Sequence, residues 1–327
     1  MQLRRYTSAD KAEWDRFVQS SRNGTFLFLR GFMDYHSDRF TDHSLIISDD
    51  KGWVACLPAC ERPEGVYSSH AGLTYGGFVL APRVGAGTVM ALFDMVKVYL
   101  KKEGFATWYY KQVPYIYHRQ PAEDDEYALW RIAAELEVCN LSTAIDLRSS
   151  FSPAVEERRG RGKRRAHKSG YTLRLLTSPA ELQAYWPIIE ENLRQCHNTA
   201  PVHSAAEMQL LMERFPQQIR CWLADGPDSS QSATGLSPAG ILLMFECGPV
   251  THSQYPHATA EGKQQGVMDL LFLHAIDYYR QERPDVRYFD FGISNEQGGR
   301  FLNEGLQAQK EGFGARGVTY RQWRIDL

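Results

Sequence analysis

The stretch LRRYTS at residues 3–8 recurs, little changed, as LRLLTS at residues 173–178. Each copy precedes a stretch with helical periodicity that contains a tryptophan, Trp14 in the first and Trp186 in the second. A short apolar run that closes on serine is typical of a strand followed by a capped helix. This internal repeat therefore predicts two related units in one chain.

Later elements recur in the same order. Strand-like runs at residues 53–60 and 239–247 each precede a second short run, around Val66 or Val250. Two helices follow, and strands are expected after them at residues 105–110 and 286–291. The apolar residues of each helix recur at i, i+3, i+4, i+7 and i+11, which predicts one buried stripe. They are Val89, Leu92, Phe93, Val96 and Leu100 in the first helix, and Met268, Leu271, Phe272, Ala275 and Tyr279 in the second.

The blocks are offset by about 170 to 185 residues, which indicates a tandem duplication rather than a short-period solenoid. A length of 327 residues also favours two domains. We expect residues 1–150 to form one unit and residues 151–327 the other, with the joint in the polar stretch near residues 146–153. The polar insert Asp225–Pro238 is expected to be a hairpin or a disordered loop.

Composition places the chain among globular proteins, with 43% hydrophobic and 23% charged residues. Lys and Arg total 37 against 39 acidic residues, so no global field attracts nucleic acid or membrane. The N-terminus lacks an apolar signal segment, and the longest apolar run, Ala239–Phe245, is too short to span a bilayer. Six cysteines without zinc-site spacing favour buried, reduced thiols. We expect a cytoplasmic protein.

Three runs carry a resemblance to a known family. They are Trp14–Tyr35, Arg158–Arg174 and, most specifically, FDFGISNEQGGRFLNEGLQAQKEGFGAR at residues 289–316, which contains GL at 305–306, Lys310 and FG at 313–314. With the order of elements, they resemble the Fem-type (FemABX) peptidyltransferases and related tandem GNAT acyltransferases. The resemblance implies an α/β (α+β) fold of two tandem GNAT-like units. Each unit would be a mixed, mostly antiparallel sheet flanked by helices, with a cleft between the units. It also implies that strand 317–327 returns to the first unit, whereas the sequence alone assigns it to the second.

The same resemblance implies a bacterial enzyme of cell-envelope biogenesis. It would transfer an acyl or aminoacyl group from acyl-CoA or aminoacyl-tRNA to a primary amine of a cell-envelope or amino-sugar precursor. No heptad run is present, so the chain resembles the members without a coiled-coil arm. No metal is expected, because no HExxH pair occurs, and no GxSxG motif suggests a covalent nucleophile.

Amide formation requires an acceptor amine held against an activated carbonyl, donors for the oxyanion and a route for protons. Tyr255, at a strand end, is a candidate to donate a proton to the leaving group or to hold the acceptor substrate, although packing is the commoner role of a tyrosine. Lys310 is the second catalytic candidate. The helix pattern alone predicts a solvated lysine, with Leu302, Leu306 and Gln309 facing inward. The resemblance instead implies a cation near the transferred carbonyl or the donor phosphate.

The start of the second long helix is the candidate donor site, because backbone N–H groups at a helix N-terminus bind phosphate. Its residues are Gly262, Lys263, Gln264, Gln265 and Gly266, and Arg316 is a weaker candidate for the same role. The stretch Lys263–Met268 keeps one glycine, Gly266, where acetyl-CoA-binding relatives usually carry two small residues.

A basic run at residues 156–168 is the candidate anion site, with Arg158, Arg161, Arg164 and Arg165 as its binding residues. Gly160 and Gly162 weaken a helix here and favour an adaptable phosphate-binding surface, and a solvated helix face is the alternative. Candidate anions are tRNA, a nucleotide diphosphate on the acceptor, or coenzyme A. The alternative function is a non-catalytic anion-binding, RNA-binding or assembly protein that uses this run.

The remaining acceptor candidates lie in loops. Tyr75, in GLTYGG, lines an acceptor site or belongs to a bulged strand end. His203 lies in a loop before an expected helix at residues 205–215, which Ser204 and Glu207 cap. We expect this loop to be a flexible lid, and a base role for its histidines is the alternative. Short polar side chains at the turn DFGISN are typical of a ligand crevice and of any tight turn. They are Asp290 and Ser294, with Asn303 nearby.

Overall fold

The computed structural model describes residues 1–227 and 237–327 and divides the chain into two compact units. The first unit contains residues 1–141, 295–302 and 318–327, and the second contains residues 142–294 and 303–317. The chain therefore passes between the units within β9 (Glu135–Asp146) and near the start of β17 (Arg316–Asp326). Residues 228–236 of the expected polar insert lie outside the described part of the chain.

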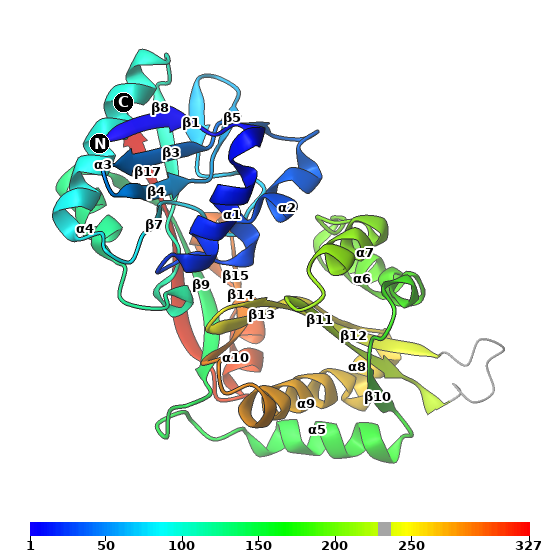
Figure 1. Cartoon of the computed structure of the whole chain (residues 1–327). Helices are drawn as coiled ribbons and strands as arrows, with labels where there is room; N and C mark the ends of the chain where they lie inside the picture. The colour runs from blue at the N-terminus through cyan, green and yellow to red at the C-terminus, as the bar shows by residue number, and fades with distance from the viewer. Residues whose placement is uncertain (228–236) are drawn as a thin grey trace. The chain divides into compact units, whose positions relative to one another are not determined.

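The first unit holds two sheets (Figure 1). An antiparallel sheet has the order β1-β3-β4-β7, with β1 Gln2–Arg5, β3 Leu45–Asp49, β4 Gly52–Leu57 and β7 Val79–Leu80. The other strands run in the order β17-β8-β6-β5-β2, with β8 Thr107–Lys111, β6 Val66–Ser68, β5 Cys60–Arg62 and β2 Thr41–Asp42. Only the β6–β8 pair of this set is parallel. The hairpin β15 (Asn295–Glu296) and β16 (Phe301–Leu302) completes the strands of the unit.

Four helices cover these strands: α1 Lys11–Ser20, α2 Arg30–Met33, α3 Ala86–Lys102 and α4 Asp124–Arg131. The apolar stripe predicted for the first long helix is confirmed in α3. All five of its predicted residues are fully buried and pack in one core with Leu45, Tyr67 and Trp108. A 3.6-residue period therefore located the main core helix of this unit.

The strands of the second unit are mostly antiparallel. They follow the order β10-β11-β12-β13-β14, and β14 pairs with the last residues of β9. Their bounds are β10 Thr172–Leu175, β11 Ile219–Asp225, β12 Pro238–Cys247, β13 Val250–Ala258 and β14 Tyr288–Ile293. Only β13 and β14 are parallel, and they pair at three positions alone. The predicted class, a mixed and mostly antiparallel sheet flanked by helices, is confirmed.

Helices cover both faces of this sheet (Figure 1). Helices α6 (Leu182–His197) and α7 (Ala205–Arg214) lie on one face, and α9 (Val267–Glu282) lies on the other. Helix α5 (Glu157–Lys168) packs against α9, with α8 (Ala260–Gln265) and α10 (Glu304–Glu311) completing the set. Because α9 lies between the sheet and α5, it buries eight residues instead of the single stripe predicted.

Helix α5 corrects the expectation that its glycines create an adaptable surface. The helix is continuous, and Gly162 is buried where α5 meets α9. A Cβ on Gly162 would lie 1.9 Å from Asp269 Oδ2. This glycine is therefore required for close helix packing.

The cysteine expectation holds in part. All six cysteines are free, but Cys139 and Cys196 are exposed while the other four are buried.

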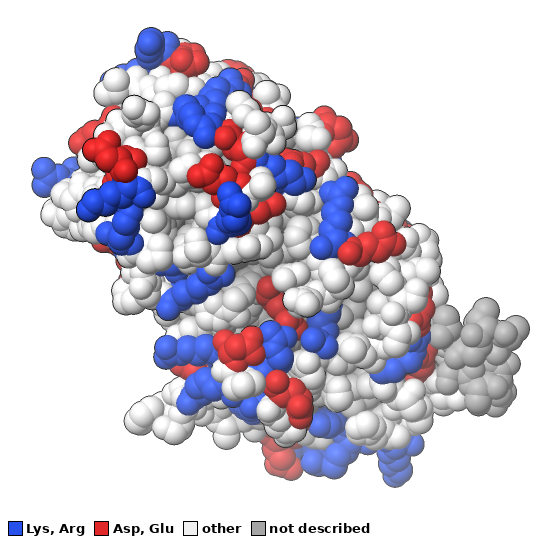
Figure 2. All heavy atoms as spheres, viewed as in Figure 1, with Lys and Arg blue, Asp and Glu red and all other residues white. Residues whose placement is uncertain are grey.

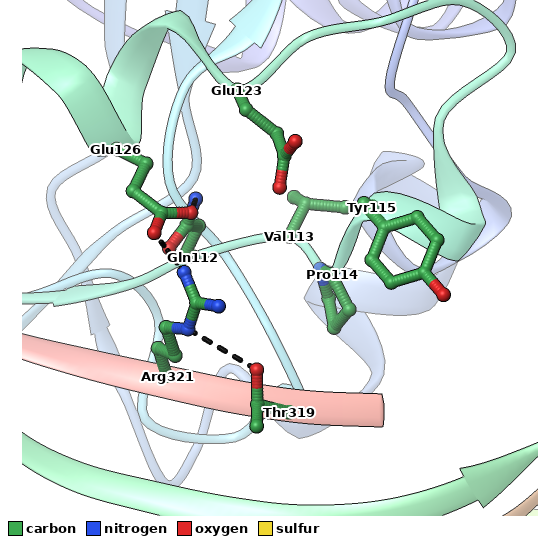
Figure 3. A pocket seen from close by; sticks show the side chains of 8 residues that line it. All are labelled: Gln112, Val113, Pro114, Tyr115, Glu123, Glu126, Thr319 and Arg321. Carbon is green, nitrogen blue, oxygen red and sulfur yellow. Dashed lines mark hydrogen bonds and ion pairs between the residues drawn. The ribbon is translucent and has the colours of Figure 1, made fainter. Parts of the chain in front are cut away.

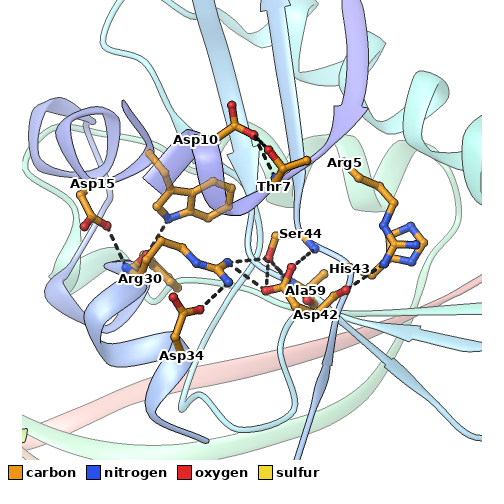
Figure 4. Close-up of polar contacts among 12 residues, drawn as sticks. Arg5, Thr7, Asp10, Asp15, Arg30, Asp34, Asp42, His43, Ser44 and Ala59 are labelled. Atoms are coloured by element: carbon orange, nitrogen blue, oxygen red, sulfur yellow. Dashed lines mark hydrogen bonds and ion pairs between the residues drawn. The ribbon is translucent and has the colours of Figure 1, made fainter. Parts of the chain in front are cut away.

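A buried guanidinium joins three elements of the first unit (Figure 4). Arg30 of α2 donates to Asp34 Oδ1 at 2.5 Å and to Asp42 Oδ2 at 2.9 Å. The guanidinium also lies 3.9 Å from the centroid of the Tyr6 ring. Its side chain is only 4% exposed, so these partners are needed to offset the loss of hydration.

Replacing this cation is expected to destabilise the first unit. In Arg30→Met, the Asp34 and Asp42 carboxylates lose their common partner, at a cost of about 3 kcal/mol of unfolding free energy. Denaturant unfolding measures the change. Arg194→Met is the matched control, because Arg194 is exposed and its ion-pair partner among the described residues is Glu191 on its own helix. Equal midpoints for the two variants would contradict the structural role of Arg30.

A second stability prediction concerns how low pH changes the unfolding free energy. His70 is buried beside His36, and burial with the neighbouring histidine lowers the pKa of His70 to about 3. In the unfolded chain, His70 binds a proton near pH 6.5, whereas in the folded chain it stays neutral at that pH. The unfolding free energy therefore falls as the pH drops below 6.5, by about 1.4 kcal/mol per pH unit for this group. In His70→Asn, which suits the local φ of +30°, the slope of the unfolding free energy between pH 6.5 and 4.5 is expected to be shallower. An unchanged slope would exclude His70 as its source.

Candidate active site

The parallel strands β13 and β14 diverge inside the second unit. Their pairing ends at His252 and Asp290, after which β13 continues beside β12 with a bulge at Gln254. Strand β14 continues beside β9 after an irregularity between Asp290 and Ile293. Gly292 lies in that irregularity with a φ of +79°, a conformation that favours glycine.

Four polar side chains meet at this divergence, and we call them the divergence cluster: Ser142, His252, Asp290 and Lys310. His252 Nδ1 lies 2.7 Å from Asp290 Oδ2, and Ser142 Oγ donates to Asp290 Oδ1 at 2.5 Å. The backbone N–H of Gly292 also donates to Asp290 Oδ1, at 3.2 Å. Asp290 is fully buried, so these partners are what hold a charge in the interior.

Lys310 is buried, not solvated as its helix pattern predicted. Its Nζ donates to the carbonyl oxygens of Gly292 and Ile293, at 2.7 and 2.6 Å. Burial lowers the pKa of Lys310 to about 8, against the opposing effect of the Asp290 carboxylate. An ammonium has three donors, so the contacts within the described residues leave one N–H for a ligand.

The face of α10 also differs from the prediction. Leu302 precedes the helix and is exposed, and Leu306 and Gln309 are only half-buried. Gln307 and Lys310 face inward instead, and Gln307 Oε1 accepts from Thr143 Oγ1 at 3.0 Å. The stripe was misplaced because the helix begins at Glu304, after an N-cap by Asn303.

Two hydroxyls near the cluster have no hydrogen-bond partner among the described residues. They are Ser253 Oγ on β13 and Ser294 Oγ just after β14, and both side chains are buried. A buried hydroxyl without a partner costs free energy. Such oxygens are consistent with a polar ligand in the same region.

Tyr255 is joined to His203, another predicted site residue. Tyr255 Oη lies 2.7 Å from His203 Nδ1, and its ring packs edge-on against Trp186. Burial raises the pKa of Tyr255 to about 12. The capping box of Ser204 and Glu207 before α7 is confirmed, and it fixes His203 at the helix entrance. The partners of Tyr255 differ from those of Lys310.

The predicted phosphate segment spans α8 and the start of α9. Lys263 donates to Asn192 of α6, and Gln265 Oε1 accepts from Ser169 at 3.1 Å, whereas Gln264 is exposed. Gly262 is buried, and its N–H donates to Thr259 Oγ1 at 3.0 Å. Gly266, with a φ of +89°, lies directly against the backbone of Gly162. A phosphate-binding role for this segment stays a prediction.

The packing at Gly266 gives a stability prediction. A Cβ there would lie 2.4 Å from the Gly162 carbonyl oxygen, and its positive φ adds strain. Gly266→Ala is expected to lower the unfolding free energy by about 3 kcal/mol, since a left-handed conformation alone costs about 1–2 kcal/mol. Gly305→Ala, at an open position of α10, is the control and is expected to be neutral or stabilising. Similar thermal midpoints for both would refute this packing role.

The basic residues of α5 differ in their surroundings. Arg159 and Lys163, which face α9, pair with Asp269 and Asp277. Among the predicted binding residues, Arg158 donates to the Ala308 carbonyl at 3.2 Å and Arg161 pairs with Glu157 at 3.1 Å. Arg164 and Arg165 are exposed. Figure 2 shows basic and acidic side chains interspersed on the visible face.

The other predicted site residues are dispersed. Asn303 caps α10 and donates its N–H to the Ser294 carbonyl at 2.9 Å. Arg316 is exposed and donates to the neighbouring Ala315 carbonyl. Tyr75 lies in the interior of the first unit, where its hydroxyl donates to Thr25. Tyr75 is only 2% exposed, and its role in an acceptor site stays a prediction.

Sequence reasoning did not single out His252. It is paired with Asp290 through the register of two parallel strands that helix α9 separates in the chain. A possible signal was that each strand carries one polar residue where the parallel pair ends, the usual ligand edge of such sheets.

The first unit has two polar hollows. One is narrow and is bordered by Gln112, Glu126, Thr319 and Arg321, where Arg321 pairs with Glu126 (Figure 3). The other is a cavity of about 200 Å³. Its lining residues are Thr74, Lys111, Gln112, Val138, Asn140, Tyr320, Arg321 and Gln322. Burial lowers the pKa of Lys111 to about 8, and its Nζ donates to the carbonyls of His70, Ala71 and Leu73.

Residues 156–298 match the family model of the acetyltransferase (GNAT) domain. The matched region includes His252 and Asp290 and excludes Lys310. The match bears out the expected GNAT domain for this region of the chain and supports an acyltransferase. A search of curated proteins gave no match.

Solved structures support the same fold over the whole chain. FemX aligns with a TM-score of 0.70 at 12% identity, covering 100% of this chain and 98% of FemX. A tandem GNAT protein from the clavulanic acid biosynthesis pathway, without AcCoA, aligns with a TM-score of 0.54 at 14% identity, covering 99% of this chain and 98% of that protein. The C-terminal domain of a putative lysylphosphatidylglycerol synthetase from Agrobacterium fabrum aligns with a TM-score of 0.61 at 12% identity, covering 98% of this chain and 93% of that domain. The resemblance to Fem-type and tandem GNAT acyltransferases is thus confirmed at the level of fold.

Two searches of the described residues gave negative results. Within residues 1–227 and 237–327, no three or more His, Cys, Asp or Glu side chains group to hold a metal ion. Over the same residues, every helix is too short or too polar to cross a bilayer.

Proposed function

We propose that this chain is an N-acyltransferase that forms an amide on a primary amine at the divergence cluster of the second unit. The observation that carries the proposal is Lys310, a buried ammonium with one donor left over, beside a His–Asp pair where two parallel strands part. Amide formation needs a fixed cation or N–H for the developing oxyanion and a group that accepts the amine proton. The cluster offers both.

Lys310 would act on the oxyanion of the transferred carbonyl or on a donor phosphate. The carbonyls of Gly292 and Ile293 hold its Nζ in place before a substrate arrives. A donor fixed in advance stabilises a transition-state charge without reorganisation. Its lowered pKa gives the prediction that transfer declines as pH rises through about 8, where the ammonium loses its proton.

Two donors are supported by different observations. The GNAT domain match favours acyl-CoA, whereas the Fem-type fold also fits aminoacyl-tRNA. Either donor carries phosphate, which the exposed Arg164 and Arg165 of α5, the α8 segment and Arg316 would bind. Tyr255 with His203 would hold the acceptor or assist the leaving group. The acceptor would be a cell-envelope or amino-sugar precursor in the cytoplasm of a bacterium.

A non-catalytic anion-binding function for residues 156–168 has less support. Several of the cations already pair with carboxylates, among them Arg159 with Asp269 and Lys163 with Asp277. Such pairs reduce the charge available to an RNA or another anionic polymer.

Lys310→Met tests the proposal. Transfer from labelled acetyl-CoA, and in parallel from lysyl-tRNA, is measured with L-lysinamide and glucosamine as acceptors. Removing one oxyanion donor is expected to lower kcat about 100-fold and to abolish the decline near pH 8.

The control is Lys163→Met, which removes a lysine that pairs on the α9 side of α5. Its kcat should stay within a factor of two or three of wild type. A melting curve for each variant separates lost folding from lost catalysis. The proposal fails if the wild-type chain transfers neither donor group to either amine, or if Lys310→Met is fully active.

A further inference from the structure

We infer that His252 is the general base of this site, and that its acceptors are aliphatic amines that arrive protonated and lose a proton within it. The inference rests on the proposed function and adds a catalytic residue and an acceptor class to it. It is carried by the hydrogen-bonded chain from His252 through Asp290 to Ser142.

The geometry sets the tautomer of His252. Its Nδ1 lies 2.7 Å from Asp290 Oδ2, and an ionised carboxylate only accepts hydrogen bonds. Nδ1 therefore carries the hydrogen, and the lone pair of a neutral imidazole is on Nε2. Nε2 is the nitrogen that can take a proton from an amine.

The carboxylate that orients the ring is itself fixed. Asp290 is fully buried, and its Oδ1 accepts from Ser142 Oγ and from the Gly292 N–H. These groups are supplied by the sheet: Asp290 lies opposite His252 in the parallel pair, and Ser142 lies on the neighbouring β9. Catalytic groups held by strands keep their geometry better than groups on loops.

Among the hydrogen-bonded side chains from His252 to Ser142, the His252 imidazole is the one that a substrate can approach. Its side chain is 14% exposed, whereas Asp290 is 0% exposed. Gly292 leaves space at the reactive edge, because a Cβ there would lie 3.4 Å from His252 Cε1 and 4.0 Å from Nε2. The nearby charged groups on the packed elements are Asp290 on β14 and Lys310 on α10.

The reaction balances without an additional reagent. The ammonium first gives one proton to His252 Nε2, and the resulting amine nitrogen attacks the carbonyl carbon of the donor. The carbonyl electron pair moves onto oxygen, next to Lys310. The second proton leaves nitrogen for solvent as the C–N bond is completed. The oxyanion then reforms the carbonyl, the bond to the thiolate or ribose oxygen breaks, and His252 returns its proton to that leaving group.

His252→Gln is the first test, assayed with acetyl-CoA and with lysyl-tRNA as donors. With L-lysinamide as acceptor, kcat is expected to fall about 100-fold or more, the range for loss of a general base. Hydroxylamine, which is already neutral at pH 7, should lose much less rate. The matched control is His274→Gln, an exposed histidine of α9 that should keep wild-type rates with both acceptors. Equal loss for both acceptors, or no loss for either, would overturn the base assignment.

A second measurement does not depend on turnover. Nitrogen-15 NMR of the full chain reports which ring nitrogen of His252 carries hydrogen. The expected result is the Nδ1–H tautomer in wild type and its loss in Asp290→Asn. A wild-type Nε2–H tautomer would overturn the inference even if the chain is an active acyltransferase. Conversely, an Nδ1–H tautomer in a chain without any transfer would refute the proposed function and retain the relay geometry.

Discussion

The parting of two parallel strands is the constraint on which the second unit depends. Once β14 leaves β13 after Asp290, the carbonyls of Gly292 and Ile293 need new hydrogen-bond donors in the interior. Lys310 supplies them from a helix that follows later in the chain. The same divergence places Asp290 between His252 and Ser142. One local feature of the sheet thus provides a buried cation, a buried anion and an imidazole.

The helix layer behind the sheet limits how the chain can vary. Helix α9 lies between the sheet and α5, and the close approach of α5 requires glycine at two positions, Gly162 and Gly266. The sequence at the start of α9 therefore reflects packing as well as any role in binding phosphate. The basic residues of α5 divide likewise between an inner face, which pairs with α9, and an outer face that is exposed.

Much of the fold was predictable from periodicity and from local signals. The stripe of α3, the Ser204 capping box and the duplication depend on neighbours within a few residues or on a repeat, which a sequence displays directly. The site was harder to predict. The burial of Lys310 depends on carbonyls 17 and 18 residues away, and the His252–Asp290 pair depends on strand register across α9. The burial of Tyr75 was not predictable, because nothing local distinguishes a core tyrosine from one that lines a site.

The most direct test of the central claim is a crystal structure with a stable donor analogue. Two probes suffice: a ketone analogue of acetyl-CoA, and a CCA oligonucleotide that carries an amide-linked lysine at its 3′ end. The account predicts that one of them binds with its carbonyl oxygen in hydrogen-bond range of Lys310 Nζ and its carbonyl carbon beside His252 Nε2. A carbonyl seated away from the divergence cluster, with Lys310 still bonded only to Gly292 and Ile293, would contradict it.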